Sequence, residues 1–201
     1  MTEFVAKARS SRITPKREAE LYEAVLDLLR EGGYEALTMD AVAARTRSSK
    51  ATLYRKWGGK AELVAKAVRH SKASTSADEI DTGSLGGDLH ALALRADDYE
   101  VERNSALLRG LAAAIHTNPD LLTAFREYLI EPDMVEFHRV LQHAIGRGEV
   151  RADNPAIGFL THMMIGGPAA HTMIDERPPT QAFLLAYIDA VILPALSART
   201  A

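Results

Sequence analysis

The chain has 201 residues and no cysteine, which excludes disulfide bonds, cysteine-ligated zinc and thiol nucleophiles. Its net charge is only −3, but the charge is unevenly distributed. Residues 1–72 contain 15 Lys and Arg against 9 Asp and Glu, whereas residues 73–201 contain 9 against 18. A basic head on an acidic body is expected of a protein in which only the head meets phosphates.

The first helix is predicted to start after Thr14, because threonine is a favourable N-cap and Pro15 suits the first helical position. One apolar stripe follows, formed by Leu21, Val25, Leu28 and Leu29. Gly32 and Gly33 predict the end of this helix. The basic residues of the preceding arm, Lys7, Arg9 and Arg12, either add contacts in a DNA minor groove or belong to a tail without a role.

Residues 38–63 (TMDAVAARTRSSKATLYRKWGGKAEL) are the most informative segment. Thr38 is a plausible N-cap for a first short helix, and Ser48 and Ser49 can cap a second one. Leu53 is the clear apolar anchor of the second helix, whose other residues are mostly polar, cationic or aromatic. This pattern is typical of a helix-turn-helix whose second helix lies in a DNA major groove. A solvated helical hairpin with cations that serve solubility is the alternative.

The expected DNA contacts follow from the chemistry of the side chains. Lys50 and the helix-start amides suit phosphates, as do Tyr54 and Lys60, while Thr52 and Arg55 can reach base edges. The candidate DNA-binding residues are Thr38, Ser48, Ser49, Lys50, Thr52, Tyr54, Arg55 and Lys60.

In this segment the chain resembles the TetR family of bacterial one-component transcriptional repressors. The shared pattern is Gly-x-x-x-x-Thr from Gly33 to Thr38, followed by Ser49, Lys50, Thr52, Leu53, Tyr54, Trp57, Lys60 and Leu63. The family usually has glycine at the turn and an apolar residue next, where this chain has Arg47 and Ser48. Arg47 is therefore expected to adopt a backbone conformation that glycine adopts freely, and Ser48 to give up a buried apolar contact.

The remainder of the chain is predicted to be all-α, because no segment shows the strict alternation of strands. We expect an N-terminal arm over 1–13, a helix-turn-helix DNA-binding domain over 14–70, a connecting loop over 71–88 and a helical body over 89–201. Pro132 should kink or interrupt a long helix that starts near Leu121. Two further helices are expected over 155–173 and 179–198.

Helix 155–173 is nearly apolar on every side, which is typical of a central core helix or of one shared with a partner chain. In TetR-like proteins the last two helices form a four-helix dimer interface, and the resemblance implies a homodimer here. Burial inside the monomer is the alternative. The candidate interface residues are Gly166, Ala170, Leu184, Tyr187, Ile188 and Val191.

The resemblance also implies an inducer pocket in the body. Its candidate lining, apolar with few ionisable groups, is Leu111, Ile115, Phe125, Tyr128, Phe137, His162 and Met163. For each of these residues taken singly, ordinary core packing is the better explanation, and the pocket is favoured only for the set as a whole. No cofactor or metal is expected: His138 and His143 are five residues apart, and His162 and His171 are nine apart.

Other classes of function fit less well. Gly58-Gly59-Lys60 lacks the flanking residues of a phosphate loop, and no nucleophile elbow is present, so we do not expect an enzyme. A helical adaptor that binds only proteins would explain the apolar C-terminal helices but not the basic head. No apolar stretch reaches the length of a membrane span, and the first residues lack the core of a signal peptide. The sequence therefore predicts a cytoplasmic homodimeric repressor that binds a palindromic DNA operator and is released by a small hydrophobic ligand; activator action stays open.

Overall fold

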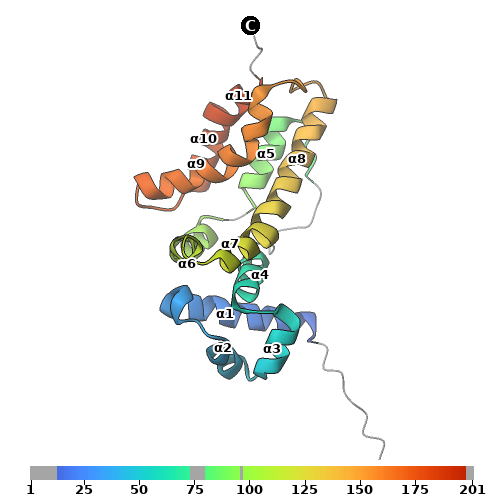
Figure 1. Ribbon diagram of the computed structural model, residues 1–201. Helices are drawn as coiled ribbons and strands as arrows, with labels where there is room; N and C mark the ends of the chain where they lie inside the picture. The colour runs from blue at the N-terminus through green and yellow to red at the C-terminus, as the bar shows by residue number, and fades with distance from the viewer. Residues whose placement is uncertain (1–12, 73–79, 96, 198–201) are drawn as a thin grey trace, which may run out of the picture.

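The computed structural model describes residues 13–72, 80–95 and 97–197, and the regular structure in these ranges is helical (Figure 1). The candidate arm residues Lys7, Arg9 and Arg12 lie outside the described residues. The helices are α1 (Pro15–Ala36), α2 (Met39–Thr46), α3 (Lys50–Trp57), α4 (Lys60–Lys72), α5 (Leu85–Ala93), α6 (Asp98–Ile115), α7 (Pro119–Phe125), α8 (Glu131–Gly146), α9 (Leu160–Ile174), α10 (Gln181–Tyr187) and α11 (Leu193–Ser197). Three short turns of other helical types join some of these helices. They are the π-helical turns η1 (Arg126–Ile130) and η3 (Ile188–Ile192) and the 3₁₀ turn η2 (Pro155–Phe159).

The head consists of α1, α2 and α3, with α4 leading from it into the body (Figure 1). Thr14 caps α1 as predicted, since its hydroxyl accepts the Arg17 N–H at 3.3 Å. The predicted glycine stop falls at Gly33, whose φ of 73° breaks the helical backbone before a last turn that reaches Ala36. Leu21 and Val25 of the apolar stripe are fully buried.

The hydrophobic core falls into two clusters. The first joins the head to α6, α7 and η1, with α4 in its middle, so the head and the lower body share one core. The second cluster joins α5, α8 and the C-terminal helices at the other end of the molecule (Figure 1). The loop predicted over 71–88 is shorter than expected, because α4 continues to Lys72 and α5 begins at Leu85 after the cap Ser84.

The interruption predicted at Pro132 takes the form of a π-turn. In η1 the Glu131 N–H donates to the Arg126 carbonyl, so the hydrogen bonds of the long helix shift by one residue just before the proline. Proline lacks an N–H and its ring collides with the preceding turn, which the wider turn accommodates. The same device recurs at η3, directly before Leu193 and Pro194.

The Asn154 side chain connects the start of η2, which precedes α9, to the end of α11. Its side-chain oxygen accepts the Ala156 N–H at 2.8 Å, and its amide donates to the carbonyls of Ala195 and Leu196 at 3.1 and 2.7 Å. The helix predicted over 155–173 thus begins with the 3₁₀ turn η2 before α9. The last helix begins at Gln181, two residues later than predicted, because Thr180 and not Pro179 supplies the cap.

A buried carboxylate fixes the start of α5 to the end of α8. Asp88 is fully buried; it accepts hydrogen bonds from Thr82 N and Oγ1 at 2.6 and 2.8 Å and from the Arg147 guanidinium at 3.0 Å. Burial alone would raise the pKa of Asp88, but these hydrogen bonds outweigh it and hold the pKa below its ordinary value of 3.8.

The Asp88 carboxylate should make the free energy of unfolding fall in acid. Because the folded-state pKa of Asp88 is lowered, its contribution is complete above pH 3.8 and is lost as the pH falls through the folded value. Asp88→Asn should lower the free energy of unfolding at neutral pH by about 1–3 kcal/mol, since charged hydrogen bonds are lost in a buried place. Urea unfolding at several pH values should show a shallower loss of stability below pH 4 for the variant than for the parent. If the stability of the variant and the parent falls equally steeply with pH, Asp88 does not contribute to the loss of stability in acid.

Candidate DNA-binding site and dimer surface

The turn between α2 and α3 is built on a left-handed residue. Arg47 has φ 50° and ψ 38°, which confirms the expectation that it adopts a glycine-like conformation. In this geometry the Ser48 N–H donates to the Ala43 carbonyl at 3.0 Å and the Arg47 N–H donates to the Ala44 carbonyl at 3.3 Å. These two bonds close the end of α2 as a Schellman motif and set the angle at which α3 leaves.

The two serines after the turn have different roles. Ser49 caps α3: its hydroxyl accepts the Thr52 N–H at 3.1 Å and shares a hydrogen bond with Thr52 Oγ1 at 2.8 Å. The prediction that Ser48 can also cap is wrong, because its hydroxyl donates back to the Thr46 carbonyl at 3.4 Å. Thr38 caps α2 as predicted, accepting the Ala41 N–H at 3.1 Å. The N-termini of both short helices are therefore capped by side chains of the residues directly before them.

Helix α3 is fixed to the head by Leu53 and Trp57, which are 0% and 1% exposed. The indole N–H of Trp57 donates to the Tyr22 hydroxyl at 3.1 Å, and that hydroxyl donates to Glu18 at 2.8 Å. Burial, together with Glu18, raises the pKa of Tyr22 to about 12. The chain of hydrogen bonds holds one side of α3 rigidly against α1 and leaves its other side free.

The free side of α3 carries the predicted contacts. Tyr54 is 44% exposed, and Arg55 is exposed with no hydrogen-bond or ion-pair partner among the described residues. Lys50 is exposed and forms an ion pair with Asp40 at 2.9 Å, which raises the pKa of Lys50. The ammonium of Lys50 therefore stays charged, and an exposed pair of this kind is weak enough to exchange for a phosphate.

Lys60 has a different environment from the other candidates. Its ammonium donates to the Tyr34 carbonyl at 2.8 Å and lies 4.0 Å from the centre of the Tyr34 ring. Half-burial lowers the pKa of Lys60. This side chain fixes the start of α4 to the end of α1, a structural role that the sequence did not suggest.

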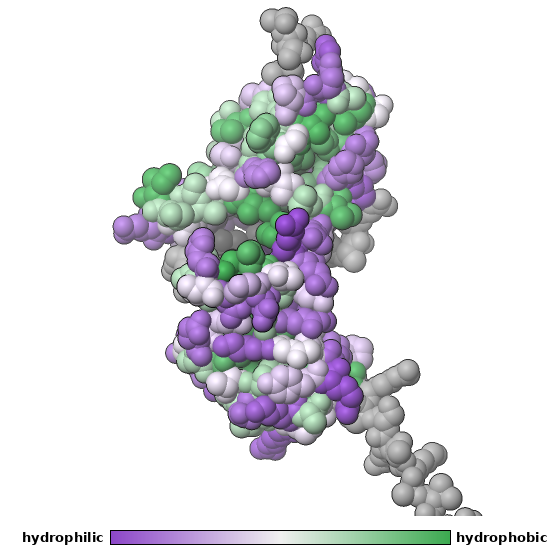
Figure 2. All heavy atoms as spheres, in the orientation of Figure 1, coloured by the Kyte–Doolittle hydropathy of each residue, from purple (hydrophilic) through white to green (hydrophobic). Residues whose placement is uncertain are grey.

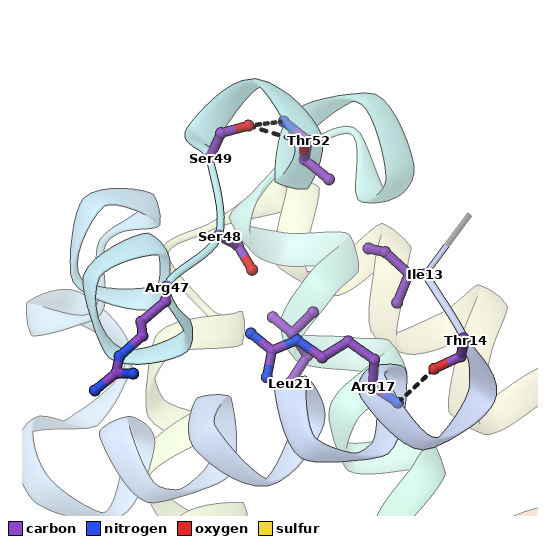
Figure 3. Close-up of a pocket in the computed structure, with 8 residues that line it drawn as sticks. All are labelled: Ile13, Thr14, Arg17, Leu21, Arg47, Ser48, Ser49 and Thr52. Atoms are coloured by element: carbon purple, nitrogen blue, oxygen red, sulfur yellow. Dashed lines mark hydrogen bonds between the residues drawn. The ribbon is translucent and has the colours of Figure 1, made fainter. Parts of the chain in front are cut away.

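A surface hollow of about 430 Å³ lies between the start of α1 and the start of α3 (Figure 3). It is lined by Ile13, Thr14, Arg17, Leu21, Arg47, Ser48, Ser49 and Thr52. Arg17 crosses it, with one guanidinium nitrogen bonded to the Thr46 carbonyl and another to Glu20 at 2.9 Å. Three of these residues, Ser48, Ser49 and Thr52, were among the candidate DNA-binding residues. The residues that α1 contributes were not, because the approach of α1 to α3 depends on tertiary packing.

The structure separates the residues expected to line an inducer pocket. Leu111, Ile115, Phe125 and Tyr128 belong to the core cluster shared with the head. Phe137 and Met163 belong to the second cluster, and His162 is exposed with its ring 6.2 Å from that of Phe159. The expected lining is therefore not one continuous surface.

The expected dimer residues also divide. Gly166 and Ala170 are exposed, Val191 is 41% exposed, and Leu184 and Tyr187 are half-buried. Ile188, at 2% exposed, belongs to the core of its own chain, so its assignment to the interface is wrong. Its apolar character suited either place, and only the packing of η3 on the second cluster distinguishes them.

Close packing of α9 on α10 depends on Gly167. A Cβ atom at this position would lie 2.4 Å from the Tyr187 ring, so a larger residue would require that ring to shift. The ring column continues from Tyr187 to Phe183, and Phe183 stacks on the His171 ring at 3.9 Å. At the outer end of α9, Met173 and Ile174 are 83% and 77% exposed, an apolar patch seen at the left edge of Figure 2.

Comparisons with known proteins agree with this architecture. Residues 21–67 match the family model described as bacterial regulatory proteins, tetR family, and residues 79–191 match the tetracyclin repressor-like C-terminal domain. An HTH-type transcriptional regulator from Mycobacterium bovis is 36% identical over 188 residues, which are 92% of this chain and 90% of the relative. The chain belongs to the TetR family.

Other relatives of this TetR-family protein extend the match. A protein named DNA-binding transcriptional repressor TetR, from Mycobacteroides abscessus, is 33% identical over 80% of this chain and 88% of its own length. A crystal structure of a TetR family transcription regulator superposes with a TM-score of 0.66 at 27% identity, covering 92% of this chain and 100% of that one. A regulator from Rhodococcus sp. gives a TM-score of 0.70 at 20% identity, which shows the shared fold alone.

Family membership confirms several expectations from the sequence. The protein is an all-helical, DNA-binding transcriptional regulator with a helix-turn-helix head, and regulators of this family are not enzymes. Within the described ranges, no group of three or more His, Asp or Glu side chains is placed to hold a metal ion. None of the helices in those ranges is long and apolar enough to cross a membrane.

Proposed function

We propose that this TetR-family protein is a homodimeric repressor that binds a palindromic operator and is released by a small hydrophobic ligand. The observation that carries the proposal is the free side of α3, where Tyr54 and Arg55 project from a helix held by Leu53 and Trp57. A rigid helix with an exposed cationic side is what readout in the major groove requires. The name of the Mycobacteroides abscessus relative, a transcriptional repressor, supports repression as the direction of control.

The exposed faces of α9 and α10 support a dimer. Gly166 and Ala170 on α9, and Ala182, Ala186 and Ala190 along α10 and η3, are exposed small residues that let another helix approach closely. With Val191 they are apolar residues that the chain leaves exposed, and the proposal places them together in one interface. Two copies related by a twofold axis would place their α3 helices about 34–36 Å apart, on successive turns of one DNA face.

Ligand release requires that the body and the head are mechanically connected, and α4 supplies the connection. Arg69 and Lys72 both form ion pairs with Asp133 at the start of α8, at 2.9 and 2.8 Å. Tyr128 in η1 donates to Glu62 of α4 at 2.9 Å. A ligand that displaces η1 or the start of α8 would therefore move α4 and the head with it.

Whether the ligand lowers or raises DNA affinity depends on which arrangement of the protein it binds more tightly. A ligand lowers DNA affinity only if it binds the body better in the arrangement that does not fit the operator. The molecular surface is hollowed between α6 and the outer end of α9, with apolar residues on its borders (Figure 2). The expected ligand is apolar because the side chains around both clusters are mainly aliphatic and aromatic.

Arg55→Ala tests the DNA-reading role of α3. The operator would first be isolated by repeated selection of bound duplexes from a random pool, and located by footprinting upstream of the gene. Loss of one good base contact should weaken operator binding by about 1–3 kcal/mol and relax the preference at one position of each half-site. Electrophoretic mobility shifts against the operator and its single-base variants measure both effects.

Arg126→Ala is the matched control, because Arg126 is an exposed arginine on the body whose loss leaves the head intact. It should bind every duplex like the parent. If Arg55→Ala also binds the operator and its variants like the parent, α3 is not the reading helix. A parent protein that selects no sequence at all would favour the adaptor function instead.

A further inference from the structure

Most cations of the helix-turn-helix are held by acidic or carbonyl groups of the same chain. Arg45 binds Glu31 through both guanidinium nitrogens at 3.1 and 2.8 Å, and Lys50 binds Asp40 at 2.9 Å. Arg47, like Arg55 on the reading side of α3, differs, because within the described residues no hydrogen bond or ion pair engages its side chain. Its guanidinium can bind a phosphate without first leaving an internal partner.

The backbone makes arginine an unfavourable choice at this position. The left-handed conformation of Arg47 brings Cβ close to the following carbonyl in any residue except glycine. The turn requires this conformation, because the Ser48 and Arg47 N–H bonds that close α2 form only there. A residue that costs stability where glycine would not is a sign that its side chain serves another purpose.

The Arg47 side chain is exposed and can meet a phosphate beside the turn. It starts at the edge of the hollow between α1 and α3 and points away from Ser48 and Arg17, which lie on the other side of the turn (Figure 3). The Ser48 side chain points toward the space between the turn and Arg17 (Figure 3). Hydroxyl and guanidinium groups are the usual donors to the oxygens of a DNA backbone.

We propose that Arg47 binds a backbone phosphate of the DNA strand that passes beside the turn between α2 and α3. The inference rests on the proposed function and adds a contact at the residue where this chain departs from the family pattern. A phosphate carries no sequence information, so Arg47 adds affinity for every duplex and leaves base preference unchanged.

The test compares Arg47→Gly and Arg47→Gln in the full chain, with a random-sequence duplex as the probe. Arg47→Gly should be more stable in urea unfolding, because glycine adopts the left-handed conformation freely, and yet bind DNA more weakly. The slope of log affinity against log salt concentration should fall by about one for each head, since one phosphate contact is lost. Arg47→Gln keeps a Cβ atom without the charge, so it should lose the same slope with no gain in stability.

Arg47→Lys is expected to retain the salt slope of the parent because it keeps the charge. Unchanged slopes in both Arg47→Gly and Arg47→Gln would overturn this inference and would leave the proposed function intact if Arg55→Ala still relaxes base preference. A parent protein that shows no salt-dependent binding to the duplex would overturn the proposed function itself. A loss of slope in Arg47→Gly and Arg47→Gln supports the phosphate contact.

Discussion

Val191→Glu is expected to convert the protein to monomers that bind the operator about 10²–10⁴-fold more weakly. The side chain is 41% exposed and belongs to the proposed interface, so a carboxylate there would be buried without a partner when two copies meet. Loss of the dimer also removes the gain in effective concentration that two linked heads have on one palindrome. Sedimentation velocity measures the assembly, and mobility shifts measure the affinity.

Val135→Glu is the matched control, because Val135 is 70% exposed on α8 and lies outside the proposed interface. It should remain dimeric with parental affinity. Ile188→Glu does not serve as a test, because Ile188 is 2% exposed in its own core and a charge there would unfold the body. A Val191→Glu protein that sediments as an undisturbed dimer would place the interface on another surface.

The elements that depend on local chemistry were predictable from the sequence. Thr14, Thr38 and Ser49 cap the helices at the positions expected, because a cap depends on residues three positions away. The left-handed backbone at Arg47 followed from the resemblance to the family, which usually has glycine at this position of the turn. The family pattern around α3 added the DNA-binding function, which the caps alone do not indicate.

The remaining differences come from contacts between residues far apart in the chain. Ile188 and Val191 are both apolar and three residues apart, yet η3 turns the first into its own core and the second outward. Hydrophobic periodicity indicates that a residue is buried but not which surface buries it. Lys60 has the sequence position of a phosphate contact, but the Tyr34 carbonyl and ring lie beside it in the folded head.

Trp57→Ala is expected to lower the free energy of unfolding of the head by about 3–5 kcal/mol and with it the fraction that binds DNA. The indole is 1% exposed, meets the Tyr22 ring edge-on at 5.9 Å and donates its N–H to the Tyr22 hydroxyl. Truncation therefore leaves a cavity beneath α3 and removes this hydrogen bond, while the hydroxyl still donates to Glu18. Trp57→Phe keeps most of the ring. Beyond the cost of its smaller volume, it should lower the free energy of unfolding by only about 1 kcal/mol, because one hydrogen bond is lost.

The chain has a single tryptophan, so the fluorescence of the parent protein reports the unfolding of the head. Circular dichroism follows all the helices and can be used for the variants as well. Since the head and lower body share one core through α4, the two signals of the parent should change together in urea. A Trp57→Ala protein as stable as the parent would show that α3 is held mainly by Leu53.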